Sequence, residues 1–279
     1  MARNLLRAGH SVTVYNRSRD KAQALAGDGA QVADSPAAAC RGVEAAISML
    51  ADDHAVLETV LGENGIVGGL GAGAIHVSSS TISTACARQL AAAHESKGQV
   101  YLSAPVFGRP DAAEAAKLVV VPGGPAQAIE RCRPIFDAIG RQTIVAGDQP
   151  WQANAVKVCG NFMIASMLET FSEAFATLRK AGVAPQMFLE TMSSLFGSPV
   201  YANYGRLIVE GKFEPAGFAL KLGAKDVRLA LATAEECGAP MPIASLLRDQ
   251  LLSALAHGQG DMDWSSVALV AARAAGLDG

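Results

Sequence analysis

Short apolar runs alternate with longer stretches of helical periodicity from the start of the chain to Pro150. Runs rich in β-branched and small apolar residues predict strands, whereas the alanine-rich stretches between them predict helices. The expected strands are Ser11–Tyr15, Ala45–Leu50, Ile75–Ser78, Val100–Leu102, Leu118–Val121 and Thr143–Val145. The expected helices are Asp20–Ala26, Ala55–Leu61, Thr84–Lys97 and Ala126–Ile139. This alternation predicts βαβ units and a parallel sheet that is covered on both faces.

The pattern changes after Pro150. Trp151–Lys180 contains no proline, and its apolar residues recur at helical spacing, which predicts one long helix. The rest of the chain, from Pro185, keeps a helical periodicity that is interrupted by glycine and proline. We therefore predict an α/β domain over residues 1–150 and an all-helical domain over residues 151–279, joined by the long helix.

Composition narrows the range of partners. Half of the 279 residues are hydrophobic, 18% are charged and the net charge is −3, as in well-packed globular proteins. Because there is no basic excess, we do not expect a nucleic-acid partner. No apolar stretch is long enough to cross a membrane, and Met1–His10 lacks the apolar centre of a signal peptide, so we expect a cytoplasmic protein without membrane association. Five scattered cysteines with no CxxC pair predict reduced thiols and no metal site.

The end of the first expected strand carries a polar tripeptide. Ser11–Tyr15 is followed by Asn16, Arg17 and Ser18, with no carboxylate. In dinucleotide-binding folds an acidic side chain at the end of the second strand binds the ribose 2′-hydroxyl and repels a 2′-phosphate. In such a fold Ser11–Tyr15 would be that second strand. Arg17 offers instead a planar cation with several donors for a phosphate, and its neighbours add hydrogen bonds. The tripeptide predicts binding of NADPH in preference to NADH; the alternative is an ordinary polar turn.

The segment from Met1 to Ser18 resembles the beginning of proteins of the β-hydroxyacid dehydrogenase family. In that family a strand and a GxGxMG-type turn come directly before a segment like Met1–Gly9, and the turn cradles the cofactor pyrophosphate. We therefore expect the first strand and the glycine-rich turn to be missing from this chain. Either the complete protein starts upstream or the chain is a degraded relative, and the later motifs favour the first explanation. The resemblance implies a Rossmann-type NAD(P)-binding domain followed by an all-helical domain for substrate binding and dimerisation.

Two further segments resemble cofactor contacts of the family. The segment Met49–Asp53 matches a strand end whose backbone lines the adenosine and nicotinamide ribose, and Ser80-Thr81 matches a pair beside the nicotinamide. Taken alone, each is a strand end with small polar residues. The cofactor-binding residues that the resemblance implies here are Met49, Leu50, Ala51 and Thr81.

The loop Ser103–Arg109 resembles the family's DAPVSGG segment, in which a serine and glycines hold the substrate carboxylate. Phe107 replaces that serine, so a hydrogen-bond donor is lost and the pocket is narrower. Arg109 replaces the second glycine and could supply a guanidinium fork for the carboxylate, or it could be a solvated loop charge. The substrate-binding residues implied in this loop are Ser103, Phe107, Gly108 and Arg109.

The long helix begins WQANAVKVCGN, and Lys157 and Asn161 lie four residues apart on one face of it. Burial of a lysine generally lowers the pKa of its ammonium group, which brings that group closer to the range useful for general acid catalysis. The segment resembles the family signature GxGxxxKxxNN, although Trp151 and Ala153 stand at the two glycines. The resemblance implies that Lys157 is the catalytic proton donor and that Asn161 binds substrate; the alternative is a lysine that reaches the surface.

A later segment, FALKLGAKDV, resembles the helix F-x-L-x-L-x-x-K-D-L of the family's second domain. The resemblance implies that Lys225 closes over the cofactor near the nicotinamide, whereas Asp226 orients or caps locally. Helix geometry alone would make these two residues a surface pair.

The order and spacing of these segments imply an NADPH-dependent oxidoreductase that acts on a small aldehyde, oxo acid or hydroxy acid and forms a homodimer or larger homo-oligomer. One alternative is an imine reductase, which shares the architecture; Phe107 is compatible with it, whereas Lys157 argues against it. Another alternative is a non-catalytic dimeric module with a degenerate cofactor site. The missing turn favours that module, and the retained Lys157, Asn161 and Lys225 argue against it.

Overall fold

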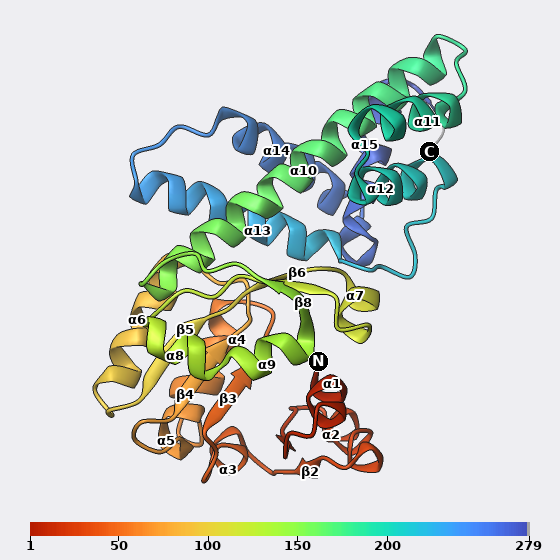
Figure 1. Ribbon diagram of the computed structural model, residues 1–279. Helices are drawn as coiled ribbons and strands as arrows, with labels where there is room; N and C mark the ends of the chain where they lie inside the picture. Colours follow the sequence, from red (N-terminus) through yellow and green to blue (C-terminus); the bar gives the residue numbers. More distant parts are fainter. Residues whose placement is uncertain (278–279) are drawn as a thin grey trace. The chain divides into compact units, whose positions relative to one another are not determined.

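The chain divides into two compact units, Met1–Lys157 and Val158–Gly279, of which the computed structural model describes residues 1–277. The two final residues of the expected helical domain, Asp278 and Gly279, lie outside the described residues. A single helix, α10 (Pro150–Lys180), contributes its first turns to unit 1 and the remainder to unit 2. The elements of each unit can be followed in Figure 1.

Unit 1 is built on short, mostly parallel strands. The first pair is β1 (Thr13–Val14) and β2 (Gln31–Val32). A second, fully parallel sheet has the order β3 (Ala45–Ser48), β4 (Ile75–Ser78), β5 (Val100–Ser103). The third sheet has the order β6 (Val106–Phe107), β7 (Leu118–Val120), β8 (Gly140–Thr143), in which β6 runs antiparallel to β7. The predicted parallel βαβ pattern is therefore present, with β6 as the exception.

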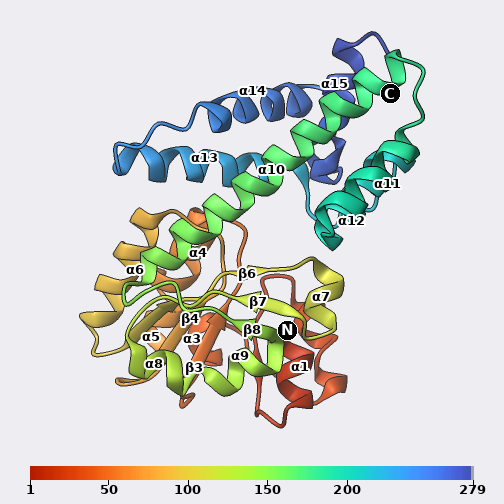
Figure 2. The ribbon, with the colours of Figure 1, turned by 45° about the horizontal axis from the view of Figure 1, so that its top comes forward.

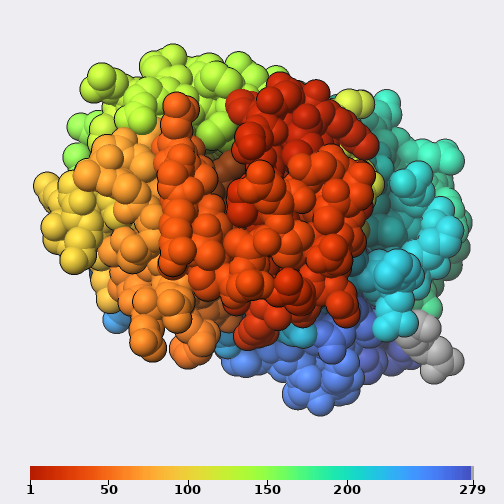
Figure 3. Space-filling model, turned by 90° about the horizontal axis from the view of Figure 1, so that it is seen from below, coloured from red at the N-terminus to blue at the C-terminus, as the bar shows by residue number. Residues whose placement is uncertain are grey.

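Helices cover both faces of the central sheet, as Figures 1 and 2 show. The α-helices of this unit are α1 (Ala2–Arg7), α2 (Arg19–Gln23), α3 (Pro36–Ala39), α4 (Asp53–Leu61), α5 (Ile66–Gly69), α6 (Thr84–Glu95), α7 (Pro110–Glu114), α8 (Ala126–Arg131) and α9 (Arg133–Ile139). Ile75, Val77 and Leu102 face a core shared with α8 and α9. Ala46 and Tyr101, on the other face, join a core with α4 and α6. Figure 3 shows the face of unit 1 to which the N-terminal segment contributes, coloured red.

Several expected elements have other bounds in the structure, and two of the differences have a clear physical reason. The strand expected at Thr143–Val145 is β8 at Gly140–Thr143, and Ile144 and Val145 are half exposed. The strand pairs with β7 directly after α9, where Gly140 allows a close approach, because a Cβ there would lie 2.7 Å from the carbonyl oxygen of Leu118. The single helix expected at Ala126–Ile139 is two helices, because Pro134 has no N–H to continue the hydrogen-bond ladder.

Unit 2 is all helical, as predicted. Besides α10 it contains α11 (Pro185–Phe196), α12 (Pro199–Glu210), α13 (Leu220–Glu236), α14 (Pro242–Ala256) and α15 (Ala268–Ala274), with short 3₁₀ turns η2 (Gln259–Asp261) and η3 (Trp264–Val267). Its core gathers apolar residues of α10, α13 and α14 around Trp264. The ring of Trp264 requires a glycine opposite it, because a Cβ on Gly223 would lie 2.7 Å from the indole. Asp263 secures this corner by accepting hydrogen bonds from the backbone N–H groups of Gly217 and Phe218.

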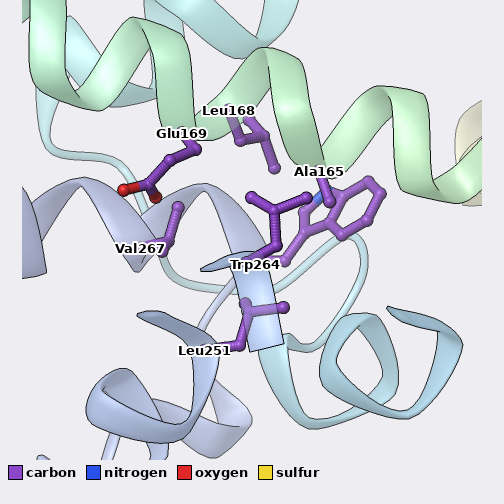
Figure 4. Close-up of a pocket in the computed structure, with 7 residues that line it drawn as sticks. Ala165, Leu168, Glu169, Leu251, Trp264 and Val267 are labelled. Carbon is purple, nitrogen blue, oxygen red and sulfur yellow. The ribbon is translucent and has the colours of Figure 1, made fainter. Parts of the chain in front are cut away.

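The helical core also buries the carboxyl group of Glu169. Glu169 of α10 is 5% exposed and lines a small cavity of about 10 Å³ together with Leu251, Trp264 and Val267, as shown in Figure 4. Burial, and then the nearby Glu173 carboxylate, raise the pKa of Glu169 to about 7. Its Oε2 atom has no hydrogen-bond partner in the described part of the chain.

Within residues 1–277, no helix is both long enough and apolar enough to cross a membrane. The five cysteines are free thiols; Cys40, Cys86 and Cys132 are buried, whereas Cys159 and Cys237 are exposed.

Candidate active site

The polar segments singled out in the sequence follow the carboxyl ends of parallel strands. Asn16–Ser18 follow β1, Met49–Ala51 follow β3, and Thr81 follows β4 by a short turn. In open α/β sheets, ligands bind in the crevice outside these strand ends. The last residues of β3, β4 and β5 are the serines Ser48, Ser78 and Ser103, which are paired in register across the sheet.

The turn after β3 is held to the turn after β4 by side-chain hydrogen bonds. The backbone N–H of Leu50 donates to Ser80 Oγ at 2.8 Å, and the Asp53 carboxylate accepts from the N–H and the hydroxyl of Ser83. Asp52 caps α4 by accepting from the N–H of Ala55. Both carboxylates therefore fix the local backbone, while Met49, which is 58% exposed, lies at the open edge.

The tripeptide after β1 forms a local turn. The N–H of Ser18 donates to Asn16 Oδ1 at 2.9 Å, so the asparagine side chain orders the backbone. Asn16, Arg17 and Ser18 are all exposed. The neighbouring Arg19 is engaged in an ion pair with Asp34.

A chain of buried polar side chains runs beneath the strand ends, and the sequence pattern did not reveal it. The Gln99 amide nitrogen donates to the carbonyls of Val67 and Leu70, which leaves Oε1 to accept from His94 Nδ1 at 2.7 Å. His94 Nε2 must then accept from His76 Nδ1, at 2.9 Å. His76 Nε2 in turn accepts from the Ser48 hydroxyl at 2.8 Å.

This direction requires both imidazoles to be neutral. Burial, and then the neighbouring His94, hold the pKa of His76 well below its usual value of 6.5. Burial also lowers the pKa of His94, although the hydrogen bond to Gln99 opposes the shift. The histidine in the expected strand IHVS was the available sequence signal, since a polar residue in a buried strand needs a partner.

Ser103 faces this polar interior. It is fully buried, and its hydroxyl lies 3.4 Å from the Tyr101 hydroxyl oxygen, to which it donates. Burial raises the pKa of Tyr101 to about 12, so the phenol stays protonated. Tyr101 also stacks on His94, with ring centroids 5.6 Å apart.

The remainder of the candidate substrate loop lies at the edge of unit 1. Phe107 ends β6, and Gly108 follows with a φ of +144°. Only glycine fits there, because a Cβ would also lie 2.6 Å from Leu118 Cδ2. Arg109 is the residue that precedes α7.

Lys157 lies over Phe107, with its Nζ atom 4.1 Å from the centroid of the ring. The contact joins the candidate proton donor to the candidate substrate loop, and the negative face of the ring attracts the ammonium. The first turns of α10 are fixed in unit 1 by Trp151, whose ring lies 4.8 Å from the Arg88 guanidinium. Gly123 lets Ala153 approach closely, because a Cβ there would lie 3.1 Å from the alanine methyl.

Asn154, one turn before Lys157, is a polar residue that the sequence analysis missed. It is 1% exposed, and neither Nδ2 nor Oδ1 has a hydrogen-bond partner among the described residues. An asparagine three residues before the lysine in an otherwise apolar helical stretch was the available signal.

In unit 2 the structure brings together the candidate residues of two separate motifs. Asn161 Nδ2 donates to Asp226 Oδ2 at 2.5 Å, and Lys225 Nζ lies 3.0 Å from Asp226 Oδ1. The alternative of a surface pair at Lys225 and Asp226, which helix geometry alone suggested, is wrong. Asp226 is 1% exposed, because its position on α13 faces α10, where its carboxylate orders Asn161.

Comparisons with known proteins agree with this architecture. Residues 1–147 match the NAD-binding domain of 6-phosphogluconate dehydrogenase, and residues 152–278 match the NAD-binding domain of NADP-dependent 3-hydroxyisobutyrate dehydrogenase. The chain is 46% identical over 267 residues to the uncharacterized oxidoreductase YfjR of Bacillus subtilis, with 96% of this chain and 93% of the relative covered. It is 33% identical over 279 aligned positions to 3-hydroxyisobutyrate dehydrogenase of Pseudomonas aeruginosa, with 96% and 92% covered. The crystal structure of 3-hydroxyisobutyrate dehydrogenase (ygbJ) from Salmonella typhimurium superposes with a TM-score of 0.87 at 26% identity, covering 96% of this chain and 94% of that one.

The fold and these matches define an NAD(P)-dependent oxidoreductase with a Rossmann-type unit and a helical unit. The chain belongs to the β-hydroxyacid dehydrogenase family, as the sequence motifs predicted. Its members act on small-molecule substrates.

Proposed function

We propose that this protein is an NADPH-dependent reductase of small aldehydes or oxo acids, working in reverse as a hydroxyacid dehydrogenase, with Lys157 as general acid and base. The observation that carries the proposal is the Lys157 ammonium held 4.1 Å above the Phe107 ring, at the loop that resembles the family's substrate segment. A fixed ammonium beside a substrate loop is suited to protonating an alkoxide as it forms.

The residues at the strand ends fit a dinucleotide. Met49, Leu50, Ala51 and Thr81 line the open carboxyl edge, and the buried Ser79 hydroxyl there has no partner among the described residues. The exposed Arg17 guanidinium supplies donors suited to the 2′-phosphate of NADPH, with Asn16 and Ser18 beside it. When bound, the cofactor supplies the hydride. Lys225 is the residue of unit 2 that contributes to cofactor binding in this proposal.

The substrate site in this proposal uses the loop and the long helix. The backbone of Gly108 and the Arg109 guanidinium bind the substrate carboxylate, and Phe107 limits the size of the substrate while holding Lys157. Ser103 supports the loop from within, since its hydroxyl is committed to Tyr101. Asn161, oriented by Asp226, donates to the substrate oxygen. The protein acts as a homodimer or larger homo-oligomer through the helical unit, in the cytoplasm.

Replacement of Lys157 by methionine tests the proposal. Methionine keeps an apolar stem against Phe107 and removes the proton, so turnover of small aldehydes and oxo acids with NADPH should fall by ~10²–10⁴. NADPH affinity measured by calorimetry should change little, because the lysine acts in the chemical step. Lys180→Met, at the exposed end of the same helix, is the control and should retain wild-type turnover.

Near-normal carbonyl reduction by Lys157→Met would contradict the proposal. If that variant also reduced cyclic imines, the imine reductase alternative would replace it, since an iminium ion needs no proton donor. A protein that binds neither NADPH nor NADH even when the family's glycine-rich turn is present would favour the non-catalytic module.

A further inference from the structure

The carboxamide of Asn154 is the most unusual polar group in the first turns of α10. The residue is 1% exposed, yet both its donor and its acceptor are without a partner among residues 1–277. An unsatisfied buried polar group typically costs about 1–3 kcal/mol, so a leucine of the same shape would be cheaper at this position. The amide is therefore unfavourable for stability alone, and an unfavourable group of this kind points to a ligand.

Helix geometry gives the direction in which this ligand lies. Asn154 precedes Lys157 by three residues, so the two side chains share one face of α10 and lie about one turn apart. The same turns of the helix are fixed in unit 1 by the buried Ala153 and by Trp151. A group that contacts Asn154 therefore lies beside the atom that Lys157 protonates in the proposed reaction.

The hydrogen-bond donor and acceptor of the Asn154 amide indicate which chemical group of a ligand it binds. Asn154 presents an N–H donor and a carbonyl acceptor side by side, and a carboxylate, which only accepts, would leave Oδ1 unsatisfied. The nicotinamide ring carries a planar carboxamide with a donor and an acceptor in the same arrangement. We infer that Asn154 binds the nicotinamide carboxamide through a pair of reciprocal amide hydrogen bonds and so fixes which face of the ring is presented to the substrate. This inference rests on the proposed function and adds a residue to its cofactor site.

Apo stability provides the first readout. Asn154→Leu removes two unsatisfied buried groups, so the ligand-free variant should unfold at a temperature equal to or above that of the wild type. A structural asparagine would give the opposite result, because its hydrogen bonds would be lost. The matched control is Gln152→Leu on the same helix, whose side chain accepts from the Gln149 N–H at 2.9 Å and which should therefore lose stability.

Binding of a modified cofactor provides the decisive readout. In the 3-acetylpyridine analogue of NADP⁺ a methyl group replaces the amide nitrogen, so Asn154 Oδ1 loses its donor. Calorimetry should give a Kd about tenfold higher for the analogue than for NADP⁺ in the wild type and in Gln152→Leu, the size expected for one unsatisfied buried acceptor. In Asn154→Leu the Kd for NADP⁺ should rise about tenfold, and the two cofactors should bind equally.

The outcomes separate this inference from the proposed function. If the wild type binds no NADP⁺ even when the family's glycine-rich turn is present, the proposed function fails. If it binds NADP⁺ and Asn154→Leu keeps the wild-type discrimination between the two cofactors, the function stands, and the amide is satisfied by water or plays a structural part. A loss of apo stability in Asn154→Leu without a change in discrimination would likewise overturn the inference.

Discussion

At the scale of single residues, one substitution in a loop changes how a lysine is held. Phe107 stands where the family motif has a serine, and its ring lies under the Lys157 ammonium. A contact of this kind contributes ~0.5–2 kcal/mol, depending on how far the cation is desolvated. The loss of a hydrogen-bond donor to the substrate is thus accompanied by a contact that positions the proposed proton donor.

In the proposed function, the preference for NADPH over NADH also depends on one residue, Arg17. Arg17→Asp should weaken NADPH binding far more than NADH binding, because a charge-assisted contact to the 2′-phosphate is replaced by repulsion. One such contact is worth roughly 1.5–3 kcal/mol, or about 10–150-fold in the ratio of the two Kd values. Calorimetric titration with both cofactors measures this ratio. Arg19→Ala, two residues along and already paired with Asp34, is the control. An unchanged ratio in Arg17→Asp would show that the phosphate binds elsewhere.

At the scale of elements, the sequence predicted the positions of those strands and helices that follow from local hydrophobic periodicity. The strand Ile75–Ser78 lies where expected, and all four of its residues are buried. The chain from Ser48 through His76 and His94 to Gln99 could not be foreseen, because it depends on the register of β3 against β4 and on the packing of α6. For the same reason, helix geometry alone suggested that Lys225 and Asp226 form a surface pair. The hydrogen bond from Asn161 of α10 to Asp226 depends on how α13 packs against α10.

The buried histidines should make unit 1 sensitive to acid. Their folded pKa values are lowered, so the unfolded chain binds protons more readily, and stability is lost as the pH falls below about 6.5. Each histidine contributes up to about 1.4 kcal/mol per pH unit to this loss. His94→Phe keeps a ring against Tyr101 and should reduce the slope of unfolding free energy against pH, measured by urea titration. Replacement of the exposed His54 by phenylalanine should not reduce that slope. Equal slopes in all three proteins would mean that His94 does not titrate on unfolding.

At the scale of the whole molecule, the two units respond to pH in opposite directions. Unit 1 has neutral buried histidines, whereas unit 2 holds Glu169 in its core. A carboxyl group with a raised pKa favours folding when it is protonated, so its contribution is full below about 4.5 and is lost as the pH rises to about 7. Mild acidification should therefore weaken one core and strengthen the other.

Glu169→Gln tests the second of these responses. At about pH 8 the variant should be more stable than the wild type by about 1–2 kcal/mol, since it buries a neutral amide in place of a partly screened carboxylate. At about pH 5 the difference should disappear, because the wild-type side chain is then protonated. Calorimetric unfolding at the two pH values measures the difference in stability between the variant and the wild type. Glu190→Gln, at an exposed position, is the control. A difference in stability that did not depend on pH would indicate a packing effect and no titration of Glu169.

The helix α10 passes from one unit to the other without a break, and this limits how genes of this family can be recombined or lengthened. Residue Lys157 ends one unit and Val158 begins the other, inside a continuous helical ladder. One inserted residue at this point would turn everything after it by about 100° and advance it by about 1.5 Å, so Asn161 would leave the face that it shares with Lys157. Insertions in the surface turns do not rotate or shift the rest of the chain in this way. Sequence length at this junction is therefore constrained as tightly as the identity of the residues on either side of it.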